Sequence, residues 1–373
     1  EQKGRLIVFG DDLGDTGNLQ RLTNDSTIGY SNGRLTNGPV FVEYMATILN
    51  KHLDSYAYSQ SSIDESWSVP EIDGFQIPSL SDQVVNFTET QRDWIRRKPG
   101  SQVTVVVNSG TSDISRLKEP SMATLEIAQK LVKGVFQQID VIKKLGFSNI
   151  IVGNLPALYT FPRWRLSAKS DKLKEFVRIT NRMFREKVVD YQKRASVKLW
   201  LLDIEEFMLV TVNSTFAQSI GAHNTTGACI TDAGACEDPA DYVFYDDIHM
   251  DMRLHHLLGL AAAHMVQGSD LQYNSTFFSE LAKEYDIGVL YHTTATIVTS
   301  TLDTMTATAD SKATAAAADP LVTSTSTSIA NCSLTVACIA IDQSVALPSA
   351  SYEQGRQTSN ASIYLLALPS PTP

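Results

Sequence analysis

Five side chains that can take part in chemistry lie in two short stretches of the chain: Asp11, Asp12, Asp246, Asp247 and His249. Carboxylate oxygens together with an imidazole nitrogen could hold a divalent metal ion. In loops such clusters more often accept hydrogen bonds from backbone N–H groups, and we expect Asp15 and Asn18 to cap the helix that follows. The sequence therefore predicts neither a metal site nor a cofactor.

Short apolar runs alternate with longer amphipathic ones over the first 285 residues. Residues 5–9, 103–108, 149–154 and 197–203 are rich in Val, Ile and Leu, which is typical of parallel strands covered on both faces. Apolar residues at three- and four-residue spacing predict helices over 40–53, 81–97, 122–145, 171–195 and 250–265. This alternation predicts an α/β fold, a three-layer α/β/α doubly wound parallel sheet whose ligands lie beyond the carboxyl ends of the strands.

Four stretches resemble the conserved blocks of the GDSL, or SGNH, hydrolases. Their sequences are most similar to those of the secreted fungal and plant esterases and carbohydrate acetyl esterases. The first is FGDDLGDTGN at 9–18, and the second is GRLTNGPVFVEYMA at 33–46, which contains Gly38. The others are VVVNSGTSDI at 105–114 and DYVFYDDIHMDMRLHHLLG at 241–259. The resemblance covers residues 1 to about 285 and implies a flavodoxin-like SGNH hydrolase fold.

The resemblance also implies a role for each matching position. In the family a serine at the position of Asp12 attacks an ester carbonyl, the histidine at His249 takes its proton, and Asp246 orients the imidazole. The backbone N–H groups at 12 and at Gly38, with an asparagine side chain at the position of Ser112, hold the oxyanion. This chain keeps His249 and Asp246, but Asp12 and Ser112 depart from the pattern.

Both departures oppose acyl transfer. Losing one oxyanion donor costs about 2.7–4 kcal/mol of transition-state stabilisation. A carboxylate about 4 Å from the oxyanion adds about 4 kcal/mol of repulsion at an effective dielectric constant near 20. Together these amount to about five decades in rate. We expect Asp12 to pair with His249 instead, which raises the pKa of the imidazole and weakens it as a base.

Three alternatives stay open at this point. Asp12 could itself attack an ester, but the product would be an anhydride, and an ionised Asp12 has no proton for His249 to remove. Another serine, such as Ser109 or Ser112, could act in an active esterase for acyl or acetyl esters of carbohydrate or lipid. An engineered change would usually replace the serine by alanine alone, so the second departure at Ser112 favours natural loss.

Composition excludes two classes of partner. The 373 residues carry a net charge of -10, and nucleic-acid binding depends on clustered Lys and Arg. No apolar run is long enough to predict a transmembrane segment. The chain begins at Glu1 without a hydrophobic leader, which we interpret as a mature form whose signal peptide has been removed.

Glycosylation motifs and cysteines both indicate a secreted, extracellular protein. Two close cysteine pairs, Cys229 with Cys236 and Cys332 with Cys338, predict local disulfides, since no second Cys or His pair has zinc-ligand spacing. A dense set of Asn-x-Ser/Thr sequons favours the secretory pathway. The seven sequons begin at Asn24, Asn86, Asn213, Asn224, Asn274, Asn331 and Asn360.

The composition changes near residue 288. Thr, Ser and Ala make up 26 of the 38 residues over 293–330, which is typical of a linker or an O-glycosylated stalk. The strand-like segments CSLTVACIAID and ASIYLLAL follow. We therefore divide the chain into an SGNH hydrolase-like domain (1–285), a Thr/Ser/Ala-rich linker (286–330) and a disulfide-containing tail (331–373). The tail either wraps its own domain or completes the sheet of a neighbouring subunit in a filament.

These patterns together predict a secreted glycoprotein whose esterase site has degenerated. The fold would be retained for binding a carbohydrate or cell-wall ligand, or for self-assembly through residues 293–373. The competing hypothesis is an active esterase of the same family.

Overall fold

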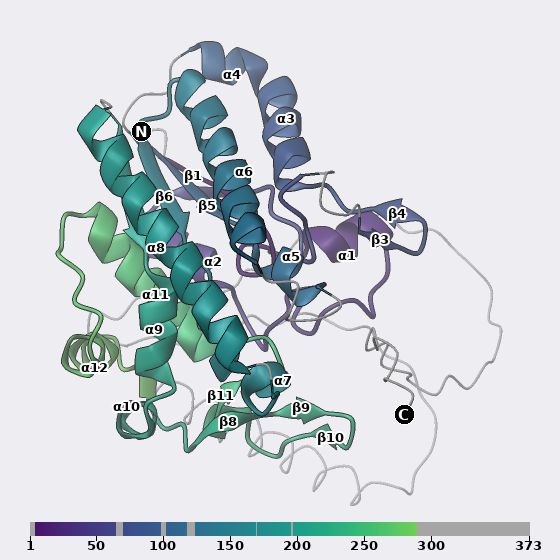
Figure 1. The fold of residues 1–373 in the computed structure, drawn as a ribbon, viewed down its shortest axis with the longest axis vertical. Coiled ribbons are helices and arrows are strands. Elements are labelled where there is room, and N and C mark those ends of the chain that lie inside the picture. Colours follow the sequence, from purple (N-terminus) through teal and green to yellow (C-terminus); the bar gives the residue numbers. More distant parts are fainter. Residues whose placement is uncertain are drawn as a thin grey trace, which may run out of the picture. The chain divides into compact units, whose positions relative to one another are not determined.

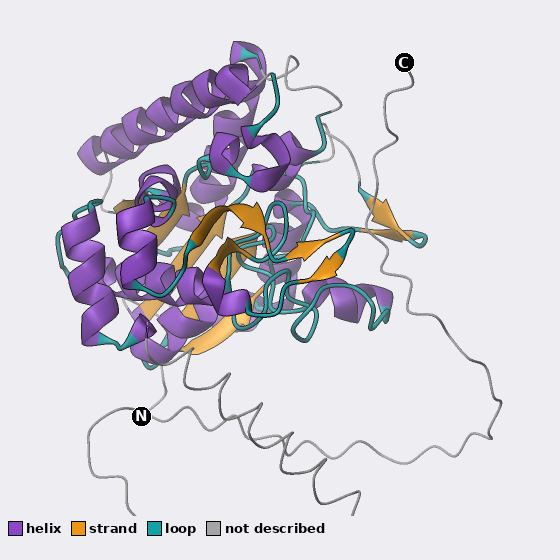
Figure 2. Cartoon of the chain, turned by 90° about the horizontal axis from the view of Figure 1, so that it is seen from below, coloured by secondary structure: helices purple, strands orange, loops and turns teal. Residues whose placement is uncertain are grey.

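A five-stranded parallel sheet forms the centre of the computed structural model, which describes residues 4–64, 70–97, 102–117, 124–168, 170–194 and 197–288. The strand order is β2-β1-β5-β6-β7, and helices lie on both sides of the sheet (Figures 1 and 2). The predicted three-layer α/β/α fold is confirmed. The strands are β1 (Arg5–Gly10), β2 (His52–Ser55), β5 (Val103–Asn108), β6 (Asn149–Gly153) and β7 (Lys198–Leu202).

The central strands are apolar because both of their faces are covered. Every residue of β5 is buried, and Leu6 to Phe9 of β1 are at most 1% exposed. Edge strand β2 has the polar sequence HLDS and is only half-buried or exposed, so it carries no apolar run that a sequence reading could detect. The helix predicted over 40–53 therefore extended too far: α2 (Phe41–Ile48) ends before Asn50, whose φ of 49° turns the chain into β2.

The long helices agree closely with their amphipathic patterns. Those predicted over 122–145, 171–195 and 250–265 are α6 (Leu125–Lys144), α8 (Ser170–Arg194) and α11 (Met252–Val266). The one predicted over 81–97 is divided into α3 (Leu80–Thr90) and α4 (Arg92–Arg96) at Gln91. Shorter helices complete the domain: α1 (Asn18–Thr23), α5 (Thr111–Ser115), α7 (Pro162–Arg165), α9 (Ile204–Thr211), α10 (Ser214–Ser219) and α12 (Ser275–Glu284).

Figure 1 shows α3, α6 and α8 in front of the sheet, with α2 and α11 behind it. Leu131, Val135 and Ile139 of α6 recur at four-residue spacing and are fully buried. On the other face Leu254, Leu257 and Ala261 of α11 are likewise buried. The core therefore lies on both faces of the sheet, and the carboxyl ends of the strands remain available for a site.

Among the described residues, three small two-stranded sheets lie outside the central one. They pair β3 (Glu71–Ile72) with β4 (Phe75–Gln76), β8 (Asn224–Ala228) with β11 (Tyr242–Phe244), and β9 (Ile230–Thr231) with β10 (Gly234–Ala235). The β8–β11 pair lies next to the candidate site, because β11 leads directly into the loop that carries Asp246 and His249.

Several predictions fall outside the described residues: most of the 286–330 linker, the 331–373 tail, and the strand-like segments within it. Over the part of the chain that is described, no helix has both the length and the apolar character needed to cross a membrane.

Candidate functional site

The first candidate residues follow the end of β1. Asp11 and Asp12 come directly after Gly10, and the Asp11 N–H donates to the Asn108 carbonyl at the end of β5 at 3.1 Å. After β1 the chain crosses to β2 on one side, and later returns to β5 on the other. Side chains from the two loops therefore meet at the point where the strand order reverses, the usual ligand position in such sheets.

Asp12 is buried, and its carboxylate has partners from three other segments. Its Oδ1 accepts the Gln60 N–H at 2.8 Å, and its Oδ2 accepts the Ser112 hydroxyl at 3.1 Å. His249 Nε2 lies 3.8 Å from Oδ2, too far for a hydrogen bond, so the two interact through space as an ion pair. Burial alone would raise the pKa of Asp12, but His249, Gln60 and Ser112 together lower it below its ordinary value.

Asp246 and His249 lie in the tight turn that follows β11. Asp246 Oδ1 accepts the N–H groups of Ile248 at 2.9 Å and of His249 at 2.7 Å. His249 Nδ1 lies 2.7 Å from Asp246 Oδ2. Burial favours the neutral imidazole, but Asp246 and then Asp12 outweigh it and raise the pKa of His249 to about 10. The imidazole is therefore protonated at neutral pH, between two carboxylates.

Asp11 and Asp247 hold neighbouring segments of the site together. Asp11 Oδ2 accepts the N–H groups of Gly110 at 3.1 Å and Ser112 at 3.2 Å, which ties the β1 loop to α5. Burial, followed by the charge of Asp12, raises the pKa of Asp11 well above its ordinary value. Asp247 turns away from this cluster and pairs with Arg163 at 2.7 Å. Within the described ranges no three His, Cys, Asp or Glu side chains form a group that could hold a metal ion.

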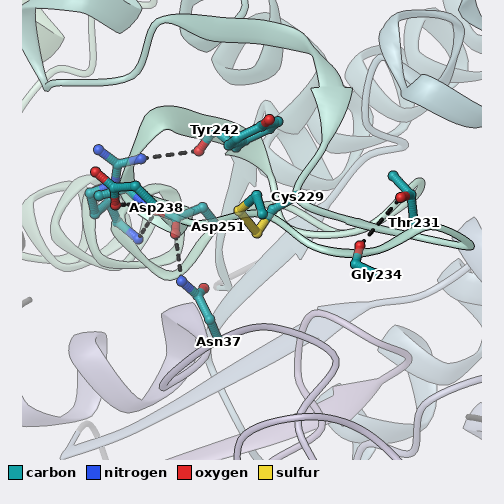
Figure 3. Close-up of a disulfide and its surroundings, with 10 residues drawn as sticks. Asn37, Cys229, Thr231, Gly234, Asp238, Tyr242 and Asp251 are labelled. Atoms are coloured by element: carbon teal, nitrogen blue, oxygen red, sulfur yellow. Dashed lines mark hydrogen bonds and ion pairs between the residues drawn. A yellow bond between two sulfur atoms is a disulfide. The ribbon is translucent and has the colours of Figure 1, made fainter.

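Residues 30–38 form a second loop of the site, in which Gly38 is the residue predicted from the sequence to take part. A Cβ at Gly38 would lie 2.3 Å from Met252 Sδ and 3.0 Å from Met252 Cβ, so a larger residue here would displace the Met252 side chain. Beside it Asn37 donates to Asp251 Oδ2 at 2.7 Å and accepts the Met252 N–H at 2.8 Å (Figure 3). These contacts hold the second-block loop against the start of α11.

Tyr30 also contacts the site, although no motif in the sequence predicts it. Its hydroxyl donates to Asp246 Oδ2 at 2.9 Å across 216 positions of sequence. Near it, Thr36 Oγ1 donates to the Met250 carbonyl at 2.9 Å. The Asn32-Gly33 pair was the available signal, because such a pair marks a tight turn and hence a fixed loop. Nothing local in the sequence, however, indicates which distant carboxylate the loop meets.

The remaining space between these groups is small. A pocket of about 20 Å³ is bordered by Asp12, His249 and apolar side chains that include Leu13, Phe161 and Ile248. A cavity of this size holds about one water molecule.

The predicted Cys229–Cys236 disulfide is confirmed and lies close to this region (Figure 3). It closes the β9–β10 hairpin, in which the Cys236 N–H donates to the Cys229 carbonyl at 2.8 Å. The Cys229 N–H in turn donates to the Phe244 carbonyl of β11 at 3.1 Å. The hairpin thus braces the strand that leads into Asp246 and His249. The predicted bridge between Cys332 and Cys338 lies outside the described residues.

The described sequons differ in exposure. Asn24, Asn86, Asn213 and Asn274 are exposed, whereas Asn224 is half-buried and accepts the Gly227 N–H at 2.7 Å. Asn331 and Asn360, like the assembly segment 293–373, lie outside the described residues.

Comparison with known protein families gave a match. The family model described as GDSL-like lipase/acylhydrolase matches residues 6–262. Comparison with curated proteins gave no match.

Among solved structures, an active site mutant of a family two carbohydrate esterase from Clostridium thermocellum, in complex with celluohexase, is 14% identical with a TM-score of 0.37. The alignment covers 72% of this chain and 64%, less than two thirds, of that one. A GDSL-like lipase from Bacteroides thetaiotaomicron is 11% identical with a TM-score of 0.35, over 71% of this chain and 88% of that one. A putative GDSL-like lipase from Parabacteroides merdae is 12% identical with a TM-score of 0.36, and the alignment covers 72% of this chain and 97% of that one. The family model matches well over half of this chain, which therefore belongs to the GDSL-like lipase/acylhydrolase family.

Proposed function

We propose that this chain is a secreted glycoprotein in which the esterase site of the family is catalytically silent. The fold is retained for binding a carbohydrate or cell-wall ligand, or for extracellular assembly through residues 293–373. One observation carries the proposal: the Asp12 carboxylate accepts hydrogen bonds from Gln60 and Ser112 and faces His249 at 3.8 Å. Asp12 therefore forms an ion pair with protonated His249, at the position where the family has its nucleophile.

The protonation states oppose nucleophilic catalysis. A serine nucleophile needs a neutral imidazole to take its proton. Here the pKa of His249 is raised to about 10, so its Nε2 already carries a proton at neutral pH. Asp12, whose pKa is lowered, has no proton to give. Attack by its carboxylate would also yield an anhydride, which is a poor intermediate for ester hydrolysis.

The oxyanion position is compromised by the same pair of residues. The Ser112 hydroxyl, at the position of the family's asparagine donor, is engaged with Asp12. The missing donor costs about 2.7–4 kcal/mol, and a carboxylate about 4 Å from the oxyanion costs about 4 kcal/mol more. Their sum corresponds to about five decades in rate.

A second candidate function is an active esterase that uses Ser112 as its nucleophile. The hydroxyl of Ser112 already donates to a carboxylate, as a serine with an acidic base would. Two facts weigh against it. Ser112 is only 1% exposed, and the lowered pKa of Asp12 makes that carboxylate a weak base. Ser109, the other candidate, is also buried.

Secretion is supported by two features. Four of the five described sequons have exposed asparagines, and Cys229 and Cys236 are joined in a disulfide, which is stable in oxidising compartments.

Cosedimentation with insoluble polysaccharide tests the proposed carbohydrate binding. Particle size with and without residues 293–373 tests assembly.

The catalytic proposal is tested by comparing the wild type with the variant Asp12→Ser/Ser112→Asn. Substrates are short-chain p-nitrophenyl esters and acetylated polysaccharide, and a fluorophosphonate probe reports on reactive serines. We expect no detectable wild-type turnover and no labelling, and a gain of about 10⁵-fold in the double variant as donor, nucleophile and neutral imidazole return together. The matched control Ser112→Asn, which keeps Asp12, should stay silent.

The possible outcomes separate the candidates. Wild-type turnover comparable to that of the double variant refutes the silent site. Probe labelling of the wild type at Ser112 supports the second candidate. If both proteins are equally inactive, the residues at positions 12 and 112 do not account for the silence, and that explanation of it is refuted.

A further inference from the structure

The Asp246 carboxylate is held by four donors. Two are the backbone N–H groups of Ile248 and His249, both on Oδ1. The other two meet at Oδ2, which lies 2.7 Å from His249 Nδ1 and 2.9 Å from the Tyr30 hydroxyl. Among the described residues, Tyr30 is the one donor to this carboxylate from outside the 246–249 turn.

The backbone holds Tyr30 in place through a tight turn. Asn32 and Gly33 both have left-handed backbone angles, with φ of 51° and 79°, as a two-residue hairpin turn requires. The Tyr30 N–H donates to the Arg34 carbonyl across this turn at 2.8 Å. Arg34 in turn makes two bonds to the Glu43 carboxylate of α2, at 2.6 and 2.7 Å. The loop is therefore anchored to a helix.

The Tyr30 ring is fixed from the other side as well. It packs edge-to-face on Tyr245, with ring centroids 4.9 Å apart. The Tyr245 N–H donates to the His249 carbonyl at 2.8 Å, so the same residue closes the turn that presents the imidazole. Backbone and ring contacts together aim the Tyr30 hydroxyl at Asp246.

We infer that Tyr30 is a positioning residue for His249, acting through Asp246: its hydroxyl fixes the rotation of the carboxylate and shares its negative charge. The inference rests on the proposed function only in taking Asp246 and His249 as the core of the site. A donor to an ionised carboxylate makes it a weaker base. Tyr30 therefore limits how strongly Asp246 holds the proton of the imidazole.

The test measures the proton affinity of His249 directly. The ring of His249 is titrated by NMR in the wild type, in Tyr30→Phe, and in the control Tyr245→Phe, which removes a hydroxyl from the ring packed against Tyr30. Since Asp12 also raises the pKa of His249, it is left unchanged in all three proteins. We expect Tyr30→Phe to raise the midpoint by half a unit or more, about threefold in proton affinity, and the control to leave it unchanged.

A second variant should shift the titration midpoint of His249 in the opposite direction. Incorporating 3-fluorotyrosine at position 30 makes the phenol a stronger donor with little change in size, so the midpoint should fall. This variant also carries the test should Tyr30→Phe not fold. No shift in either protein, or an equal shift in the Tyr245→Phe control, would overturn the inference. Ester turnover by the wild type would overturn the proposed function without affecting this result.

Discussion

Replacing Asp12 by asparagine tests the ion pair at the centre of the site. Asp12 Oδ2 and His249 Nε2 are 3.8 Å apart, and both side chains are only 10% exposed, so solvent screens them weakly. At an effective dielectric constant of about 20, unit charges at this distance attract by about 4 kcal/mol, or about 3 pKa units. We expect Asp12→Asn to lower the pKa of His249 from about 10 to near its ordinary range.

This shift makes the stability of the protein depend on pH. The pKa of His249 rises from 6.5 to about 10 on folding, so its contribution is fully present below pH 6.5 and is lost as the pH rises through 10. A shift of that size corresponds to at most about 5 kcal/mol. The lowered pKa of Asp12 reflects the same attraction and is not added to it. In Asp12→Asn the unfolding free energy that is lost as the pH rises should be only about 1 kcal/mol.

Urea unfolding between about pH 6.5 and 9.5 measures this difference. The wild type should lose several kcal/mol of its unfolding free energy over that range, and Asp12→Asn much less. Asp247→Asn is the matched control, because it makes the same chemical change in a carboxylate that pairs with Arg163 at the surface. Parallel stability profiles for the wild type and Asp12→Asn would refute the reasoning.

Two further predictions concern the disulfide and the sequons. Cys229→Ser/Cys236→Ser should lower the unfolding free energy by about 2–3 kcal/mol, because the bridge restrains a short loop of the unfolded chain. A thermal melt unchanged by this double substitution would contradict that expectation. Mass spectrometry after endoglycosidase treatment should find the exposed sequons occupied more fully than half-buried Asn224. Preferential occupancy of Asn224 would argue against exposure as the deciding factor. The exposed sites are Asn24, Asn86, Asn213 and Asn274.

The sequence by itself determined the fold class. Buried parallel strands such as β5 are continuous apolar runs, and α6 and α8 carry long amphipathic patterns, so both signals are local and strong. The Cys229–Cys236 bridge followed from closeness in sequence. The block pattern also selected Asp12, Ser112, Asp246 and His249, whose side chains contact one another in the structure.

The polar, half-exposed and interrupted elements needed the tertiary structure. The edge strand β2 presents HLDS, which has no apolar period, so it was read as the end of a helix. The interruption between α3 and α4 at Gln91 has no glycine or proline to mark it. These elements take their form from packing against the domain, which a local pattern does not record.

The chemistry of the site was likewise decided only in three dimensions. The hydrogen bond from Ser112 to Asp12 and the 3.8 Å ion pair depend on loops that follow different strands. The bond from Tyr30 to Asp246 spans 216 positions and joins two loops without periodic pattern. Residue types fix which charges and donors are available. Only the packing of strands and loops decides which of them meet, because contacts between distant segments leave no signature in either segment alone.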